Sequence, residues 1–227
     1  MIKRSIDLLI AIPSLLLLSP LMIAIAAVIK LSSPGPVFFR QERIGRAGTP
    51  FNIYKFRTMV TNAASIGPDL TIGDDTRITK VGRYLRRAKL DELPQLLNVV
   101  LGHMSLVGPR PEIAKYVALY PAAARERILS LRPGITDEAA IEFIEEARVL
   151  AEAADPQWTY VHHILPRKLD IYERYAARRS VLLDLRILGR TIRHLLFANR
   201  SHSLPVKGSL HRPTTGRRVP RVSEKHG

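Results

Sequence analysis

Apolar positions are most concentrated near the start of the chain. Residues 8–29 form an uncharged apolar run, flanked by Lys3, Arg4 and Asp7 on one side and by Lys30 on the other. A run of this length is sufficient to span a bilayer core of roughly 30 Å. A cleaved signal peptide has a shorter apolar region and a small-residue cleavage site, which does not fit this segment. The pattern therefore predicts a permanent membrane segment.

Charge and proline argue against a simple crossing. Basic residues flank the run on both sides, so a single crossing would leave one basic flank outside, against the positive-inside tendency. Pro13 and the pair Ser19-Pro20 lie within the run. Proline removes a backbone donor, so we expect a kink near Ser19-Pro20, where the hydroxyl can bond the freed backbone groups. We favour a re-entrant helix-break-helix hairpin over residues 1–31, which enters and leaves by the same face, over a straight span.

The remaining pattern predicts a small cytosolic domain over residues 32–198. A β-hairpin is expected from strands at 37–41 and 51–59. Helices are expected at 77–87, 91–101, 112–131, 138–154 and 181–197, with another that begins at Asp155-Pro156 and is kinked at Pro166. Residues 199–227 lack periodicity and are expected to form a disordered basic tail. The predicted fold class is α+β, predominantly helical.

The expected helix at 181–197 is amphipathic. Leu188 and Ile192 lie on its apolar face, and Arg186 and Arg190 lie on another face. A basic amphipathic helix of this kind can lie in the interface of an anionic membrane. A core helix with a solvated basic back is an equally good interpretation.

Composition narrows the possible chemistry. The chain has no cysteine, which excludes disulfides, thiolate metal sites and cysteine nucleophiles. Lys and Arg number 35 against 20 Asp and Glu, a formal charge of +15. This excess predicts an anionic partner, either nucleic acid, an anionic membrane face or a phosphorylated substrate. The histidines are scattered, and neither a Walker loop nor a dinucleotide-binding glycine motif occurs.

An adjacent carboxylate pair, Asp91 and Glu92, directly follows a basic cluster that includes Arg86 and Lys89. Two neighbouring carboxylates suit Mg²⁺, which also takes substrate phosphate oxygens. A carboxylate can also attack phosphorus and form an acyl phosphate, while the adjacent cations offset substrate charge. The alternative is that both acids merely favour the first turn of a helix, which is a common arrangement.

Two further motifs place cations where a phosphate can bind. Pro109 and Pro111 fix the backbone around Arg110, which suits recognition of a phosphate or a nucleobase edge. Lys55 and Arg57 are two positions apart in a predicted strand, so they project from one face and fit a diphosphate. The alternatives are a rigid loop with a solvated arginine and an exposed strand face.

Together and in this order, the motifs closely resemble one family, the bacterial sugar transferases, also called monotopic phosphoglycosyl transferases. The resemblance runs from about residue 3 to 198. The matches are Lys3-Arg4, Asp7, Ser19-Pro20, 33–36, 38–39, Gln41, Arg43, Gly45, 55–59, Asp75, Arg77, Thr79, 90–95, 104–111 and 133–136. The resemblance implies the small catalytic core of this family.

The resemblance implies transfer of a sugar phosphate from a UDP-sugar to undecaprenyl phosphate, with release of UMP, as the first membrane step of exopolysaccharide, O-antigen or glycoconjugate synthesis. Asp91 matches the family's nucleophile and Glu92 its dyad partner, and Mg²⁺ is the family's cofactor, for which both carboxylates are the expected ligands. The expected substrate-binding residues are Lys55, Arg57, Arg86, Arg110 and Pro111. The implied location is the cytoplasmic face of the bacterial inner membrane, with a monotopic topology set by the break at Ser19-Pro20.

One segment departs from the family pattern. After residues 133–136 many members continue with Gly and a Gln-Val stretch, whereas this chain has Asp137-Glu138-Ala139-Ala140. If this region contacts the sugar, donor preference is expected to differ. Two other functions remain open, a membrane-tethered nucleic-acid-binding protein and an inactive scaffold for glycan assembly. No nucleic-acid-binding motif is found, so a nucleic-acid partner is not expected, and a homo-oligomer is an open alternative.

Overall fold

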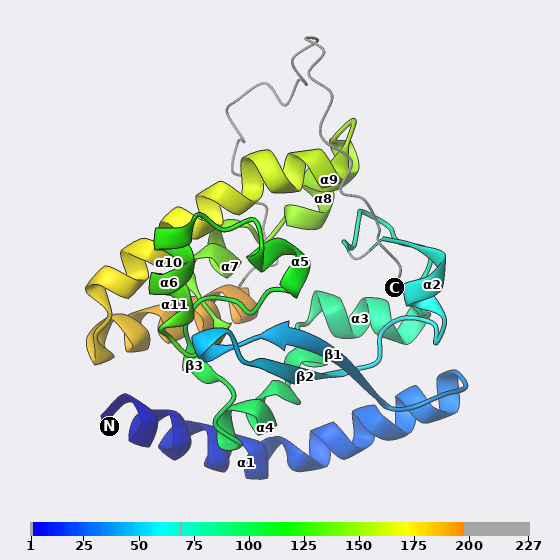
Figure 1. Cartoon of the computed structure of the whole chain (residues 1–227). Coiled ribbons are helices and arrows are strands. Elements are labelled where there is room, and N and C mark those ends of the chain that lie inside the picture. Colours follow the sequence, from blue (N-terminus) through cyan, green and yellow to red (C-terminus); the bar gives the residue numbers. More distant parts are fainter. Residues whose placement is uncertain (1, 69, 198–227) are drawn as a thin grey trace, which may run out of the picture.

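The computed structural model describes residues 2–68 and 70–197, and the expected tail at 199–227 lies outside them. The helices are α1 (Ile2–Ser32), α2 (Ala63–Ile66), α3 (Lys80–Arg87), α4 (Gln95–Val100), α5 (Ala114–Val117), α6 (Ala122–Leu129), α7 (Glu138–Glu142), α8 (Glu146–Glu152), α9 (Pro156–Thr159), α10 (Leu165–Arg178) and α11 (Val181–Phe197). The strands are β1 (Phe38–Ile44), β2 (Pro50–Phe56), β3 (Ser105–Val107) and β4 (Gly134–Thr136). The prediction of a predominantly helical α+β fold is confirmed (Figure 1).

The predicted β-hairpin is present. Strands β1 and β2 pair antiparallel, with Phe38 opposite Phe56 and Ile44 opposite Pro50. The strand at 51–59 was predicted too long, because the chain leaves the sheet after Phe56. A second, parallel pair formed by β3 and β4 was not predicted. Its strands have three residues each, which is too short for an alternating pattern to be recognised.

Several helix predictions need correction. The stretch 112–131 forms two helices, α5 and α6, because Pro121 lies between them, and the stretch 138–154 forms α7 and α8. The helix predicted from residue 91 begins at Gln95, after a 3₁₀ turn. A π-turn at Tyr160–Ile164 precedes Pro166 at the start of α10, where a simple kink was expected. Helix α11 has the predicted bounds.

Helix α1 is one continuous helix of 31 residues that bends near its middle (Figure 1). The expected interruption at Ser19-Pro20 is therefore corrected to a bend. Pro20 has no N–H for the carbonyl of Leu16, four residues earlier. The Ser19 hydroxyl donates to that carbonyl at 2.7 Å, so the predicted compensation by the neighbouring hydroxyl is confirmed.

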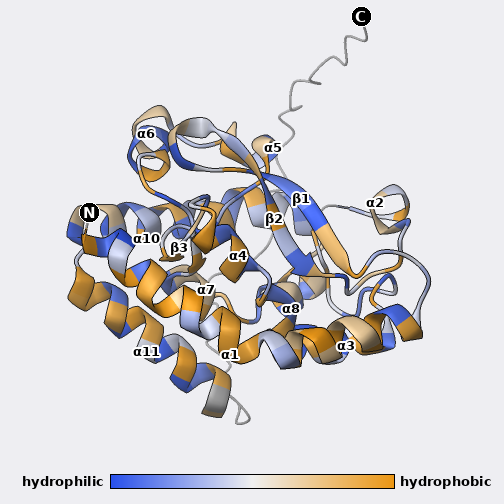
Figure 2. Cartoon of the chain, turned by 90° about the horizontal axis from the view of Figure 1, so that it is seen from below, coloured by the Kyte–Doolittle hydropathy of each residue, from blue (hydrophilic) through white to orange (hydrophobic). Residues whose placement is uncertain are grey.

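One face of α1 packs along the rest of the molecule. Ala11 is buried in a cluster with residues of β2, α4, β3 and α11, and Ile25 and Ile29 are buried against Phe56 and Leu85. The opposite face is apolar but exposed, with Leu9, Leu16, Leu17, Ile23 and Leu31 each at least 70% exposed. Figure 2, viewed from below, shows apolar colouring along both α1 and α11. Among the described residues, α1 is the helix that is long and apolar enough to cross a membrane.

Polar contacts attach both ends of α1 to the domain. Near the first end, Asp7 is buried and accepts hydrogen bonds from Ser105 Oγ (2.8 Å) and Leu106 N (3.1 Å) of β3. Near the second end, Arg57 donates to the carbonyls of Ser33 (2.9 Å) and Pro34 (2.6 Å). Because one folded domain binds both ends, α1 lies along the base of this domain.

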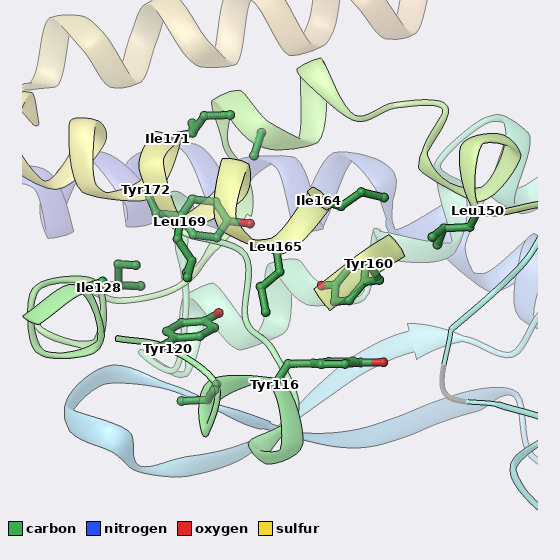
Figure 3. Close-up of a cluster of buried hydrophobic side chains, with 13 residues drawn as sticks. Tyr116, Tyr120, Ile128, Leu150, Tyr160, Ile164, Leu165, Leu169, Ile171 and Tyr172 are labelled. Atoms are coloured by element: carbon green, nitrogen blue, oxygen red, sulfur yellow. The ribbon is translucent and has the colours of Figure 1, made fainter. Parts of the chain in front are cut away.

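The largest core cluster lies on the other side of the hairpin, among α5, α6 and α10. It contains four buried tyrosines, which are Tyr116, Tyr120, Tyr160 and Tyr172 (Figure 3). Tyr116 and Tyr160 pack with their ring centroids 4.8 Å apart. This layer carries the loop that follows β3, which contributes to the candidate site.

Candidate active site

The carboxylate pair lies on a tight turn between α3 and α4. Leu90–Glu92 form a 3₁₀ turn, and Lys89 before it adopts a left-handed conformation with φ 56° and ψ 18°. A left-handed non-glycine residue costs about 1–2 kcal/mol, so the surrounding structure must stabilise this turn. Asp91 and Glu92 therefore lie in a 3₁₀ turn that precedes α4, and not in the first turn of α4 itself.

Glu92 is bound by two cations from distant segments. Lys55 of β2 donates to Oε1 at 2.6 Å. Arg110, in the loop after β3, donates through Nη2 to Oε1 at 2.5 Å and through Nη1 to Oε2 at 3.3 Å. Burial alone would raise the pKa of Glu92, but the charges of Arg110 and Lys55 outweigh it and hold the pKa well below its usual range. The two cations therefore favour the ionised form of Glu92.

Asp91 is equally close in sequence but has a different environment. It is 7% exposed, and its Oδ1 atom has no hydrogen-bond partner among the described residues. Burial raises the pKa of Asp91, with the attraction of Lys55 acting against it and the repulsion of Glu92 adding to it. Asp91 is thus a desolvated carboxylate with a free oxygen, which makes it the member of the pair that is available to react.

A buried amide positions Lys55 beside this turn. Asn98 of α4 is fully buried, and its side chain accepts from Tyr54 N (3.0 Å) and donates to Asn52 O (2.8 Å). These are backbone groups of β2 on the edge that β1 does not pair. Asn98 therefore acts in place of a third strand and fixes α4, with Glu92 before it, against the strand that carries Lys55.

The close approach of two loops positions Arg110. The backbone N–H of Gly134 donates to the carbonyl of Pro109 at 3.0 Å. A β-carbon on Gly134 would lie 2.1 Å from the nitrogen of Gly108, so a larger residue would separate the loops. The predicted rigidity of the Gly108–Pro111 run is thus provided by pairing with the β4 segment as well as by proline.

Arg43 of β1 holds the other side of this loop. It donates to the carbonyl of Pro111 (3.1 Å), to Glu112 Oε2 (3.3 Å) and to Gln41 Oε1 (2.7 Å). Tyr160 donates to the second oxygen of Glu112 at 2.6 Å. Pro111 therefore contributes its carbonyl to the support of Arg110. Arg43 was matched as part of a motif but was not predicted as a site residue.

Arg86 of α3 lies on the other side of the carboxylate dyad, which is formed by Asp91 and Glu92. It donates to the hydroxyls of Thr58 (2.8 Å) and Thr71 (3.1 Å). Burial lowers the pKa of Arg86, while the charge of Asp91 acts in the opposite direction. Arg86 thus adds positive charge near Asp91 without a hydrogen bond to it among the described residues.

Arg57 does not lie with these residues. All its side-chain hydrogen bonds go to residues 29–34, at the end of α1, and the side chain is buried. The expectation that Lys55 and Arg57 present two cations to one diphosphate is therefore corrected. Arg57 follows the last residue of β2, so the alternation of strand side chains does not extend to it.

Two buried polar groups behind Arg110 were not predicted. Asp137 caps α7 by accepting from Ala140 N (2.7 Å), and its Oδ2 has no hydrogen-bond partner among the described residues. Burial raises the pKa of Asp137 to about 6, against the attraction of Arg110. The Tyr172 hydroxyl is also buried without a partner there. The sequence feature that could have indicated Asp137 as a site residue was the departure from the family pattern at this position.

The chemistry of the site favours a phosphate-bearing substrate. Within residues 2–68 and 70–197 no group of three or more His, Asp or Glu is arranged to hold a metal ion. Asp91 has an oxygen free for a metal ion, whereas both oxygens of Glu92 are bound to cations. An ion at this pair would therefore need further oxygen ligands, which substrate phosphates supply.

Comparison with known proteins places this geometry in context. The family model described as bacterial sugar transferase matches residues 1–198. The undecaprenyl-phosphate N-acetylgalactosaminephosphotransferase of Aeromonas hydrophila, which uses UDP-N-acetylgalactosamine by its name, is 40% identical over 86% of this chain and 44% of its own length. The UDP-glucose:undecaprenyl-phosphate glucose-1-phosphate transferase of Escherichia coli is 44% identical over 62% of this chain and 31% of its own length.

A third relative has a similar length to this chain. The exopolysaccharide production protein PSS of Rhizobium leguminosarum is 36% identical over 84% of this chain and 93% of its own length. The chain thus spans less than half of the first two relatives and nearly all of the third.

Proposed function

The chain belongs to the bacterial sugar transferase family, and from this premise we propose that it transfers a sugar 1-phosphate from a UDP-sugar to undecaprenyl phosphate. The observation that carries the proposal is the contrast within the dyad, where Asp91 is buried with a free oxygen and Glu92 is held between two cations. The names of the relatives from Aeromonas hydrophila and Escherichia coli support the two substrates.

The proposed reaction has two displacements at one phosphorus atom. In the first, an oxygen of Asp91 attacks the phosphorus that bears the sugar, the bond to the bridging oxygen breaks, and UMP leaves. In the second, a phosphate oxygen of undecaprenyl phosphate attacks the same phosphorus, and the carboxylate of Asp91 leaves. The products are UMP and undecaprenyl diphosphate-sugar. A covalent intermediate lets a soluble donor and a lipid acceptor use one site in turn.

The cations around the dyad have defined roles in this scheme. Lys55 and Arg110 are paired with Glu92 in the free enzyme, and their remaining donors are available to phosphate oxygens. Arg86 adds charge on the side of Asp91. Mg²⁺ would be held by the free oxygen of Asp91, beside Glu92, together with substrate phosphates, and when bound it would neutralise charge on the diphosphate.

The arrangement of α1 supports a monotopic location on the cytoplasmic face of the inner membrane. Its exposed apolar face requires a lipid environment, whereas the domain binds both of its ends. A crossing would place these two ends on opposite sides of the bilayer, where a single domain could not bind both. We therefore propose that α1 enters the membrane and returns to the same face. The exposed Leu182, Ile192 and Phe197 of α11 would add to this surface.

The function is tested with purified protein, undecaprenyl phosphate, Mg²⁺ and a panel of UDP-sugars, with UMP release as the readout. Asp91→Asn is expected to abolish UMP release and to prevent a phosphosugar adduct from forming on the protein. Glu92→Gln is expected to reduce the rate strongly. Asp170→Asn, which removes an exposed carboxylate of α10, is the matched control and should retain activity. Full activity of Asp91→Asn would exclude the mechanism, and no transfer by the wild type with any UDP-sugar would favour the scaffold.

A further inference from the structure

A cavity of about 330 Å³ lies between the first turns of α1 and the domain. Five basic residues line it, namely Lys3 and Arg4 of α1, Arg46 between the hairpin strands, Arg132 before β4 and Arg179 after α10. The other lining residues are Asp7, Ser105, Val107, Ser130, Leu131 and Tyr175. Segments far apart in the sequence thus bring positive charge to one small space.

Most of this charge has no anionic partner. Lys3 pairs with Asp184 at 2.5 Å. Asp7 is the acidic residue of the lining, and both its oxygens are used by Ser105 and Leu106. None of the four arginines lies within ion-pair distance of a carboxylate in the part of the chain that the structure describes. Their mutual repulsion favours a bound anion.

Two of the arginines present donors in a fixed orientation. Arg46 donates through Nε to the carbonyl of Ser130 (3.1 Å), and Arg132 donates through Nε to the carbonyl of Gly102 (3.0 Å). These bonds hold each guanidinium by one edge and leave its Nη groups for a ligand. Paired guanidinium donors match the spacing of phosphate oxygens.

The position of the cavity indicates which phosphate-bearing molecule would reach these arginines. The same turns of α1 expose Ile2 and Leu9, at 73% and 74%, and Leu185 of the neighbouring α11 is 48% exposed. The turns of α1 that line the cavity therefore also carry exposed apolar side chains, and in the membrane location proposed above the cavity would lie at the level of the lipid headgroups. It is separate from the dyad, because Arg4 bonds the carbonyls of Val99 and Val100 at the end of α4, whereas the dyad precedes its start.

We propose that this cavity binds the phosphate-ester headgroup of an anionic phospholipid. The Nη groups of Arg46 and Arg132 bind the phosphate oxygens, and Arg4 and Arg179 contribute charge. The site would fix the orientation of the first half of α1 in the membrane. The proposal rests on the membrane location proposed above and does not depend on sugar transfer.

The test uses the full chain in a neutral detergent, titrated with dihexanoyl phosphatidylglycerol below its micelle concentration. Binding is followed by calorimetry and by the shift in Tm. The comparison ligands are dihexanoyl phosphatidylcholine and sn-glycerol 1-phosphate. The test variant is Arg46→Gln with Arg132→Gln. Arg148→Gln with Arg167→Gln removes the same charge from α8 and α10 and is the matched control.

The wild type and the control should bind phosphatidylglycerol saturably, and the test variant should bind it about tenfold or more weakly, because two charge-assisted contacts are lost. If the glutamine variant does not fold, Arg46→Lys with Arg132→Lys keeps the charge, loses the paired donors and should still bind more weakly than the wild type. Equal binding by a folded test variant, equal binding of phosphatidylcholine, or equally tight binding of glycerol phosphate would overturn the proposal. UMP release plays no part in these outcomes.

Discussion

At the scale of single residues, the dyad shows how two adjacent carboxylates acquire different properties. Glu92 receives three hydrogen bonds from two cations, whereas Asp91 keeps an oxygen without a partner among the described residues. The difference follows from the 3₁₀ turn, which directs successive side chains to different sides. Glu92 thereby positions Lys55 and Arg110, the cations that we propose bind phosphate, and Asp91 keeps an oxygen for the proposed attack.

The state of Asp91 predicts a pH dependence. In the proposed reaction the attacking form is the carboxylate, and burial raises the pKa of Asp91. The rate of the first displacement should therefore fall on acidification at a higher pH than an ordinary aspartate would require. A single-turnover measurement of UMP release between pH 4 and 8, without undecaprenyl phosphate, reports this step. An acid limb at or below the usual aspartate range would contradict the assignment.

Arg110 should not be replaceable by lysine. Its two Nη groups hold both oxygens of Glu92, and a lysine ammonium cannot reproduce this planar contact. We expect Arg110→Lys to reduce kcat/KM for the UDP-sugar by roughly 10- to 100-fold, with membrane co-sedimentation unchanged. Arg125→Lys, at an exposed position of α6, is the control. Wild-type kcat/KM in Arg110→Lys would remove Arg110 from the site.

Asp137 predicts a change in stability with pH. Its pKa is raised to about 6 in the folded state, so its contribution to stability is fully present below about pH 4 and is lost as pH rises to about 6. Asp137→Asn can still cap Ala140 and should remove this loss. The variant should exceed the wild type in unfolding free energy above pH 6, by at most about 3 kcal/mol.

Urea unfolding in detergent at pH 4 and pH 7 measures this difference. Asp170→Asn changes the same charge at an exposed site and should show no comparable pH dependence. If the unfolding free energy of Asp137→Asn does not exceed that of the wild type at pH 7, or exceeds it by more at pH 4 than at pH 7, Asp137 is stabilised as an anion.

At the scale of elements, Asn98 joins α4 to the free edge of β2. Asn98→Ala would leave the backbone groups of Tyr54 and Asn52 unpaired. We expect a loss of about 2–4 kcal/mol in unfolding free energy together with lower activity, because Lys55 and Glu92 are on the two joined elements. Asn62→Ala, at an exposed position, should change stability by less than about 0.5 kcal/mol. Equal stability of the two variants would contradict the role of Asn98.

The elements that sequence predicted correctly carry long local patterns. The apolar run of α1, the hairpin and the amphipathic α11 each extend over enough positions for their periodicity to be recognised. The β3–β4 pair depends instead on contact between two segments that are 29 positions apart in the sequence, with Val107 opposite Thr136. Such a contact is fixed by tertiary packing, and the glycines that permit it have no distinct local signal.

The same distinction explains the outcome for the site. Asp91, Glu92 and Arg110 were found because they lie in dense motifs, and the structure brings them together. Asn98 was missed because its role depends on the strand edge that it meets. Arg57 was misplaced because the end of β2 is set by the contact with α1. Residue type and local spacing were enough to select these candidate residues, and packing determined their partners.

At the scale of the whole molecule, α1 is a base on which the domain rests. Its inner face contributes residues to two of the three core clusters found among the described residues, and its outer face is apolar and exposed. The dyad turn, the hairpin and α4 are therefore held at a fixed height above this outer face. A soluble donor can approach from the domain side while a lipid acceptor approaches from the membrane side, which is the geometry that the proposed two-step reaction requires.

This arrangement predicts that both ends of α1 lie on the cytoplasmic side. The chain has no cysteine, so Ser5→Cys and Lys30→Cys each introduce a unique thiol at an exposed position. An impermeant maleimide should leave both thiols unlabelled in intact spheroplasts and should label both in inside-out vesicles. The control Arg148→Cys in α8 should show the same labelling pattern. Labelling of Ser5→Cys in spheroplasts, with Lys30→Cys protected, would mean that α1 crosses the membrane. The contacts of Asp7 and Arg57 with one domain could then not coexist, so this outcome would also contradict the fold described here.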